Sequence, residues 1–420
     1  MNASSRPASD SSASAPRYGM PLLTALFFGW GLITSLNDVL IPHLKAVFSL
    51  NYVQAMLVQF CFFGAYFLVS LPAGQVVRRW GYQRGMVMGL VIAAIGCALF
   101  YPAATFQTYG WFLGALFVLA SGVTLLQVAA NPYVTLLGPE QEASRRLTWT
   151  QAFNSLGTTV GPLFGASLIL AAADSVAAEA TAVRGPYLGL AAALLVIAGV
   201  LMVVKLPKVG DTQDARAAAS TPPAWRHRHL LLGVLAIFVY VGAEVSIGSF
   251  LVSVMSAPDV ASLSGSDAGH MLALYWGGAM VGRFIGAWLM KRMSAARLMT
   301  GCAVGAVVLL TVAMLAGGHL TMWALLAIGL CNAIMFPTIF SLALERLGPR
   351  TEQGSGLLCM AIVGGALVPL VQGALADSHG LLPSFVVPLV CYVYIAYYAA
   401  RGHRVVPVAT TTPAAAAVRT

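Results

Sequence analysis

The sequence predicts an all-α integral membrane protein with twelve transmembrane helices arranged in two six-helix bundles. Hydrophobic residues make up 59% of the 420 residues and charged residues only 9%, whereas soluble domains carry about 25% charged residues. Apolar runs of about 20 residues, the length that crosses a bilayer, recur along the whole chain. One long polar stretch, residues 207–228, separates six such runs from six others.

Helices are expected because an open sheet cannot satisfy its backbone in lipid, and these runs are too long for barrel strands. The expected domains are a disordered tail over 1–19, bundles over 20–206 and 229–400, a linker over 207–228 and a second tail over 401–420. The first tail is polar and rich in Ser, Ala and Pro, so we expect no cleavable signal peptide. The spans are placed near residues 20–44, 53–77, 85–104, 109–137, 148–172, 186–206, 229–253, 268–290, 297–317, 320–345, 354–376 and 382–400.

The basic residues predict the orientation in the membrane. Twenty of the 23 Lys and Arg residues fall on the side of the two termini. Only Lys45 and Arg184 fall on the opposite side, and Arg283 lies within a span. The positive-inside rule therefore places both termini in the cytoplasm of a bacterial inner membrane. The net charge of +9 is thus a topology signal, and we expect no nucleic-acid partner.

A weak internal repeat relates the two halves. The stretch from Gly74 to Gly81, after the second span, matches the stretch from Gly286 to Met293, after the eighth. The fourth and tenth spans each contain a proline and are each followed by Leu-Gly-Pro. Two similar bundles of this kind place a substrate path at their interface, near the bilayer midplane.

An acid lies inside the first span. Asp38 follows Asn37 and precedes Pro42 in an apolar run of membrane length. A charge at this depth is costly, so it marks function by default. We interpret Asp38 as a carboxylate that binds and releases a proton, and Asn37 as a substrate-binding candidate. The alternative is an interfacial acid that is solvated or paired with Lys45.

Other charged residues are candidates for a site or a gate. Glu244 lies within the seventh span, where it could bind substrate hydroxyls, carry a proton or pair with a base; we place it among the substrate-binding residues. Arg283 is the one basic residue within a span, and we expect a gate residue or an inter-helical salt bridge. Arg78 and Arg79 are expected to form a cytoplasmic lock between helices.

Neutral amides concentrate in the first half of the chain. A polyhydroxyl ligand needs donors and acceptors together, and an amide offers both. The alternative is that these amides join helices, at about 0.6 kcal/mol per hydrogen bond. Two aromatic residues, Trp30 and Phe153, could stack on the apolar face of a pyranose. The amide candidates for substrate binding are Gln59, Gln127, Asn131, Gln151 and Asn154.

Several classes of protein are disfavoured. We find no phosphate loop, no metal-ligand cluster and no nucleophile paired with a base. The six cysteines all fall within spans at spacings that suit neither disulfides nor metal. The sequence therefore predicts no cofactor, no bound metal and no enzyme activity.

Four motifs resemble a known family. The chain is similar to the major facilitator superfamily and, within it, to the fucose–hexose proton symporter group. This resemblance implies alternating access and monosaccharide uptake driven by a cation gradient. It also implies that Asp38 matches the acid of helix one that is linked to proton coupling, and that Trp30, Gln151 and Asn154 match positions lining the sugar cavity. The matching motifs are Leu36-Asn37-Asp38 with Pro42, Gln59 through Gly74, Ala129–Val134 with Leu137–Glu140, and Gln151–Ser155.

One difference between this chain and the fucose permeases narrows the predicted substrate. They have a glutamate in helix four where this chain has Gln127, which resembles the glucose/galactose transporters and leaves Asp38 as the leading proton site. We therefore predict a monomer, surrounded by the lipid bilayer, that takes up glucose or galactose with a proton. The alternatives are sodium coupling, a permease for L-fucose or N-acetylglucosamine, an exporter of sugars or drugs, and a sensor or channel that does not transport.

Overall fold

The computed structural model describes residues 19–48, 52–106, 108–165, 184–207 and 222–405. Side chains are described in these ranges except at residues 36–57, 59, 162–165 and 266. The ranges contain helices and turns and no strand. Nine of the helices found there are long and apolar enough to cross a membrane.

The helices form twelve membrane segments, as the sequence predicts. The N-terminal six are α1 (Gly19–Phe48), α2 (Tyr52–Trp80), α3 (Tyr82–Phe106), α4 (Tyr109–Leu136), α5 (Ala143–Gly165) and α7 (Arg184–Val203). The C-terminal half begins with α9 (Arg228–Ser256), α10 (Gly265–Leu289) and α11 (Ala295–Ala316). It continues with the interrupted segments α12 (Gly318–Asn332) plus α13 (Met335–Leu344) and α14 (Thr351–Met360) plus α15 (Gly364–His379), and it ends with α16 (Val386–Tyr397).

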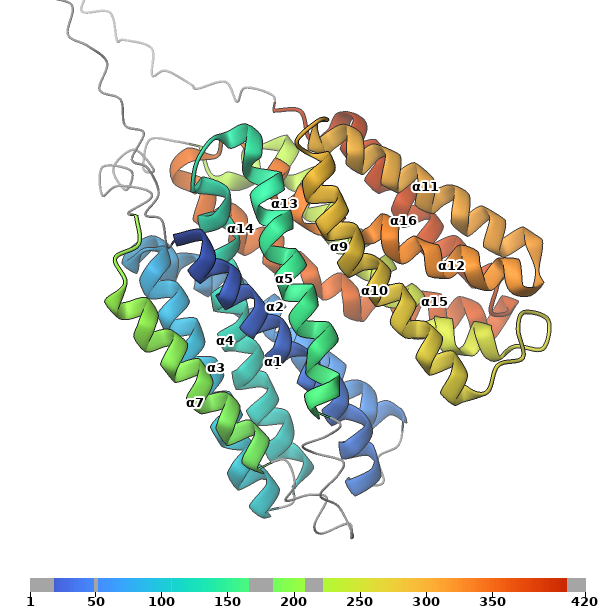
Figure 1. Cartoon of the computed structure of the whole chain (residues 1–420), viewed down its shortest axis with the longest axis horizontal. Coiled ribbons are helices and arrows are strands. Elements are labelled where there is room, and N and C mark those ends of the chain that lie inside the picture. The colour runs from blue at the N-terminus through green and yellow to red at the C-terminus, as the bar shows by residue number, and fades with distance from the viewer. Residues whose placement is uncertain (1–18, 49–51, 107, 166–183, 208–221, 406–420) are drawn as a thin grey trace, which may run out of the picture.

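The twelve segments form two bundles that meet along a few helices (Figure 1). Across the interface, α5 packs against α10 and α13, and α14 packs against α2 and α4. In Figure 1, α5 and α10 lie close together where α5 begins and α10 ends, and they diverge toward their other ends. We call the end where they meet the basic end, because it carries Arg78, Arg145, Lys291 and Arg350.

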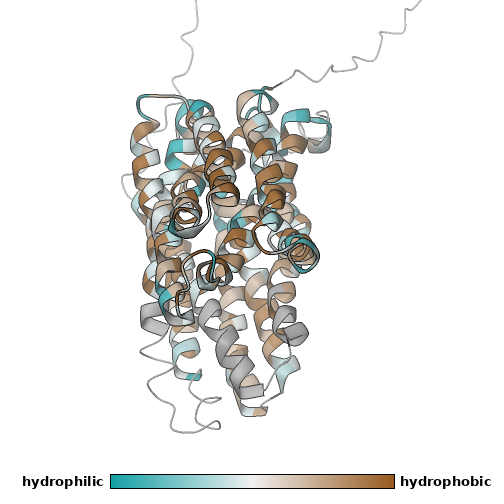
Figure 2. Cartoon of the chain, turned by 90° about the vertical axis from the view of Figure 1, so that its right-hand side faces the viewer, coloured by the Kyte–Doolittle hydropathy of each residue, from teal (hydrophilic) through white to brown (hydrophobic). Residues whose placement is uncertain are grey.

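The hydropathy of the surface agrees with a membrane setting. In Figure 2, hydrophobic residues predominate along the sides of the helices, and hydrophilic residues are concentrated toward the basic end, at the top of the view. Exposed apolar side chains such as Val196, Met202 and Leu315 would be unfavourable in water but suit contact with lipid, because lipid tails are as apolar as they are.

Prolines shape the helices that carry the interface. Pro337 has no N–H to donate to the carbonyl of Ala333, four residues earlier, and the tenth segment is interrupted between Asn332 and Met335. A 3₁₀ turn at Ala361–Val363 interrupts the eleventh segment ahead of Pro369. Pro132 lies within the uninterrupted α4. The carbonyls released by these prolines need other partners, and two such partners belong to the candidate site and its surroundings.

Glycines bring α1 and α5 close together. A Cβ at Gly31 would overlap the backbone of Asn154, and a Cβ at Gly157 would overlap the carbonyl of Phe28. Small residues of this kind let the backbones of membrane helices approach closely. The close approach fixes Asn154 on α5 beside Trp30 on α1, and both residues belong to the candidate site.

Candidate substrate-binding cavity

A cavity of about 300 Å³ lies between the two bundles. Its volume is at the small end of the range of about 300–1,000 Å³ for ligand pockets. Both bundles contribute to its wall, as the internal repeat predicts. The N-terminal bundle contributes Trp30, Thr34, Phe62, Tyr66, Gln127, Gln151 and Asn154, and the C-terminal bundle contributes Val241, Glu244, Trp276, Arg283, Phe336 and Ile362.

Amides form the polar part of the N-terminal wall. Gln127 and Gln151 are each only 4% exposed. The Nε2 of Gln151 donates to Oδ1 of Asn131 at 3.5 Å, and Nδ2 of Asn154 donates to the carbonyl of Phe27 at 3.0 Å. The Gln127 Oε1 has no hydrogen-bond partner among the described residues. Because buried polar atoms are nearly always paired, this oxygen is an acceptor that a ligand hydroxyl or water would satisfy.

Asn131 lies behind this wall. It is fully buried, and its Nδ2 has no partner within the described part of the chain. It lies one helical turn beyond Gln127, does not line the cavity, and accepts a hydrogen bond from the cavity residue Gln151. The structure thus places Asn131 where it can orient Gln151, with no direct exposure to the cavity.

The C-terminal wall carries a carboxylate backed by a buried polar network. The hydroxyl of Tyr240 lies 2.8 Å from Oε1 of Glu244 and 3.1 Å from the carbonyl of Asn332. The hydroxyl of Tyr275 donates to the backbone carbonyl of Glu244 at 3.1 Å and accepts from Nδ2 of Asn332 at 2.8 Å. Tyr392 donates to Oδ1 of Asn332 at 2.6 Å. The network holds α9, α10, α12 and α16 in register behind Glu244.

Arg283 joins the two bundles at the cavity. Its Nε donates at 3.1 Å to the carbonyl of Ala333, which Pro337 leaves without its helical partner. Its Nη1 donates to the carbonyl of Gln151 at 3.3 Å and to Oγ of Ser155 in a close contact. The structure therefore shows hydrogen bonds between bundles where we expected a gate residue or a salt bridge. Arg283 and Glu244 line the same cavity, but these two described residues form no ion pair.

Phe153 lies outside the cavity, contrary to the expected stacking position. Its ring centroid lies 5.5 Å from that of Trp149 and 5.7 Å from that of Phe284. It lines a separate apolar cavity of about 590 Å³ against the start of α1. The reason is helical geometry: at about 100° per residue, Phe153 lies roughly 160° around α5 from Gln151. Gln151 and Asn154 share one face of α5, and Phe153 does not belong to it.

Three predicted site residues lie outside the described side chains. These are Asn37, Asp38 and Gln59, so their roles remain predictions. The backbone of α1 continues through Pro42 to Phe48. Asp38 thus belongs to the continuous helix that also carries Trp30.

Contacts between the bundles also occur at the basic end. The Oγ atoms of Ser144 and Ser341 lie 2.6 Å apart, and the backbone N–H of Arg346 donates to Oε1 of Glu140 at 3.1 Å. Ser355 donates at 2.9 Å to the carbonyl of Val128, which Pro132 leaves without its helical partner. Arg78 and Arg79, the expected lock residues, are exposed at the end of α2, and their role stays a prediction.

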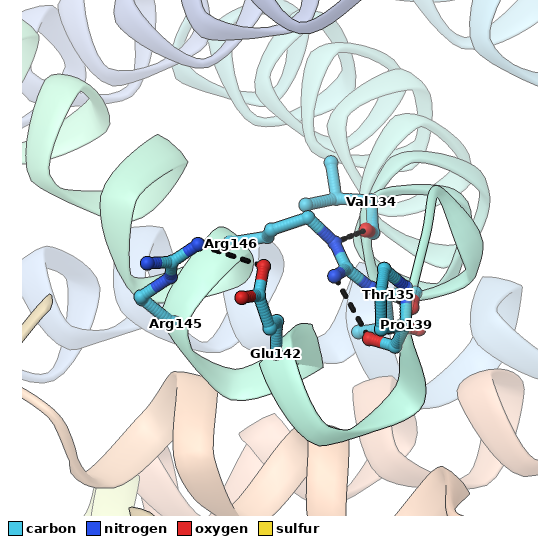
Figure 3. A network of polar contacts seen from close by, with 6 residues as sticks. All are labelled: Val134, Thr135, Pro139, Glu142, Arg145 and Arg146. Carbon is cyan, nitrogen blue, oxygen red and sulfur yellow. Dashed lines mark hydrogen bonds and ion pairs between the residues drawn. The ribbon is translucent and has the colours of Figure 1, made fainter. Parts of the chain in front are cut away.

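A buried arginine shapes this end (Figure 3). The guanidinium of Arg146 donates to the carbonyls of Thr135 at 2.7 Å, Pro139 at 2.9 Å and Val134 at 3.3 Å. These carbonyls belong to the last turn of α4 and the loop after it, so Arg146 satisfies groups that a helix end leaves unpaired. The neighbouring Arg145 instead forms a partly exposed ion pair with Glu142 at 2.7 Å. Arg146 thereby fixes the loop that carries Glu140, whose carboxylate contacts the other bundle.

Some cavity residues had no clear signal in the sequence. Thr34, Val241, Phe336 and Ile362 resemble many other residues within apolar spans. Trp276 is different, because it follows a tyrosine and precedes Gly277 and Gly278 in a span. An aromatic residue next to glycines on a helix at the bundle interface could have been predicted as a second aromatic ring in the cavity, in addition to Trp30.

The fold and the cavity define a polytopic membrane transporter, and the chain belongs to the Major Facilitator Superfamily, whose family model matches residues 22–361. It is 60% identical over 396 residues to a protein of Brucella abortus named glucose/galactose transporter, covering 93% of this chain and 96% of the relative. It is 36% identical to the L-fucose-proton symporter of Escherichia coli, covering 90% and 91% of the two chains.

Solved structures support the same assignment. The crystal structure of the transporter FucP in the outward conformation superimposes with a TM-score of 0.82 at 32% identity, covering 91% of this chain and 97% of that one. The predicted fold class, two bundles of six helices, and the predicted fucose–hexose group are confirmed. The protein is a multi-pass membrane protein of the transporter type.

Proposed function

We propose that this protein takes up a hexose, glucose or galactose, by symport with protons. The observation that carries the proposal is the cavity between the bundles, where three amides face a carboxylate and an arginine. Support comes from the relative named glucose/galactose transporter, at 60% identity over nearly its whole length, and from relatives named L-fucose-proton symporter.

The composition of the cavity suits a neutral polyhydroxyl ligand. Gln127, Gln151 and Asn154 supply donors and acceptors for hydroxyl groups, and Glu244 supplies a strong acceptor. Trp30 and Trp276 supply ring faces for the apolar side of a pyranose, one from each bundle. A sugar bound between these walls would contact both bundles and so couple binding to their relative movement.

Asp38 is our proposed site of proton coupling. An acid within a membrane helix is functional by default, and the continuous α1 carries both Asp38 and the cavity residue Trp30. In this proposal Asp38 takes a proton from the outer side and releases it inside during each transport cycle. The alternative is coupling to sodium, and uptake measured with separate pH and sodium gradients distinguishes it from proton coupling.

We further propose that both termini are cytoplasmic and that a monomer is the transporting unit. The basic residues support the orientation, because the basic end would then face the cytoplasm. The contacts at this end, such as Ser144 with Ser341, and the divergence of α5 and α10 at the other end would correspond to an outward-facing state. Rocking of the bundles around the cavity would then release the sugar inside.

The test is uptake of labelled glucose into proteoliposomes with pH and sodium gradients imposed separately. We expect saturable uptake that follows the pH gradient and that unlabelled glucose and galactose inhibit. Unlabelled L-fucose and N-acetylglucosamine are added as competitors, because they are the substrates of the two alternative permeases. Uptake that follows the sodium gradient alone, or inhibition by L-fucose alone, would contradict the proposal.

Asp38→Asn tests the coupling step within the same preparation. We expect the variant to accumulate less sugar against a gradient than the parent protein, because the proton of Asp38 is not carried, while exchange of labelled for unlabelled sugar continues. Asp377→Asn, which alters an exposed acid at the end of α15, is the control and should accumulate sugar normally. Uphill uptake by Asp38→Asn at the parental level would remove Asp38 from the mechanism.

A further inference from the structure

Two opposite charges line one wall of the cavity and are not paired with each other. Glu244 on α9 and Arg283 on α10 both belong to the C-terminal bundle and both line the cavity. The two described residues nevertheless form no ion pair. Within the described lining, Glu244 is the one carboxylate and Arg283 the one cation. Their separation therefore needs an explanation.

One part of the guanidinium is anchored within its own bundle. Nε of Arg283 donates to the carbonyl of Ala333, which Pro337 leaves without its helical donor. Arg283 and Ala333 both belong to the C-terminal bundle, so a rigid-body movement of the two bundles leaves this hydrogen bond in place. The guanidinium is planar and rigid, so its outer nitrogens change direction when the whole group tilts about the hydrogen bond to Ala333.

The other part of the guanidinium is bound to the opposite bundle. Nη1 donates to the Gln151 carbonyl and to Oγ of Ser155, both on α5. If the bundles rock against each other, as transporters of this architecture do, α5 moves relative to α10 and these bonds cannot all persist. A half-buried cation that loses its acceptors must find others, because leaving it unpaired is strongly unfavourable. The carboxylate of Glu244 is the acceptor that moves together with Arg283.

We propose that Arg283 alternates between α5 and Glu244 and that Glu244 is thereby a second proton-carrying site of the transport cycle. In the state described here, Arg283 binds α5, and the Glu244 carboxylate is free to accept a proton from water that enters the cavity. In the opposite state, Arg283 pairs with Glu244, and the O–H bond breaks to return the proton to water on the other side. One proton is bound and one released per cycle, with no other bond changed.

This inference rests on the proposed function, because it assigns Glu244 and Arg283 a role in coupling at the same cavity. The groups that face Glu244 support the assignment. Tyr240 donates to its carboxylate and Tyr275 to its backbone carbonyl, and both are neutral donors. Phe336 from α13 and Ile362 from the 3₁₀ turn, which line the same cavity, are apolar. Arg283 is therefore the charged partner, among the described residues around Glu244, that can change its ionisation between states.

The experiment measures the number of protons taken up per sugar in proteoliposomes, at saturating sugar. This ratio is independent of how fast or how tightly each variant binds. We compare the parent protein with Glu244→Gln, Arg283→Gln and the double variant. Arg297→Gln, at an exposed arginine of α11, is the matched control, and thermal unfolding of each purified variant confirms that it is folded.

With Asp38 as the first site and Glu244 as the second, each single variant should lower the proton-to-sugar ratio by about half. Glu244→Gln has no carboxylate to protonate, and in Arg283→Gln the carboxylate keeps its proton throughout the cycle. The double variant should show the same ratio as either single variant, because both changes abolish one step. Arg297→Gln should keep the parental ratio.

Three results would overturn the inference. The first is a parental ratio in Glu244→Gln, which would show that Glu244 carries no proton. The second is a lowered ratio in Glu244→Gln with a parental ratio in Arg283→Gln, which would show that Arg283 takes no part. The third is a double variant below both single variants. Absence of sugar-dependent uptake in the parent protein would instead contradict the proposed function, so the two failures are distinguishable.

Discussion

The unpaired acceptor of Gln127 provides a sharp test of the cavity. Oε1 is buried in the wall and has no hydrogen-bond partner among the described residues, so the protein gains no stability from it. If a sugar hydroxyl donates to it, the bond contributes about 0.5–1.5 kcal/mol to binding. At 1.4 kcal/mol per factor of ten, Gln127→Leu should weaken sugar binding about two- to twelvefold.

The matched variant is Asn154→Leu. Its Nδ2 donates to the carbonyl of Phe27 at 3.0 Å, so this change removes a hydrogen bond between α5 and α1 as well as a cavity amide. We expect Asn154→Leu to lower both the sugar affinity and the thermal unfolding temperature, whereas Gln127→Leu should lower the affinity alone.

The assay follows the intrinsic tryptophan fluorescence, to which the cavity residues Trp30 and Trp276 contribute, as sugar is added to purified protein in detergent. Thermal unfolding without sugar is measured on the same samples. The reasoning is refuted if Gln127→Leu binds sugar as tightly as the parent protein while unfolding at a clearly lower temperature. That pattern would mean that Gln127 joins helices and does not contact the ligand.

Three further outcomes follow from the structure. Trp30→Ala should weaken sugar binding, measured by isothermal titration. Phe153 lies outside the cavity, so Phe153→Ala should leave sugar binding unchanged. An equal loss of affinity in the two variants would restore Phe153 to the site. Arg146→Ala leaves three carbonyls at and after the end of α4 without their donor, so it should destabilise the protein by at least about 3 kcal/mol. Arg145→Ala removes only a partly exposed ion pair and should cost about 0–1 kcal/mol. Thermal unfolding of both variants measures the difference. Ser355→Ala leaves the carbonyl of Val128 unpaired at the interface and should cost about 1–3 kcal/mol; an unchanged unfolding temperature would show that water or another donor replaces it.

The composition and length of the apolar runs determined the architecture. Transfer from water to lipid is a property of each residue and adds along a segment, so twelve spans could be located without knowing which helices touch. The same reasoning identified polar residues that lipid does not tolerate, and Gln127, Gln151, Asn154, Glu244 and Arg283 all line the cavity. Asp38 stays a prediction, because its side chain lies outside the described residues.

Tertiary structure decided which partners these residues have. Sequence spacing placed Gln151 and Phe153 in the same stretch of α5, but only the packing of α5 against α1 and α10 shows which face meets the cavity. The hydrogen bonds of Arg283 join it to residues 50 and 132 positions away. Such pairings depend on how two bundles fit to within a fraction of an ångström, whereas hydrophobicity is additive along the chain. The sequence alone thus determined a membrane protein with two bundles, and the interface between them decided which of its polar residues face one another.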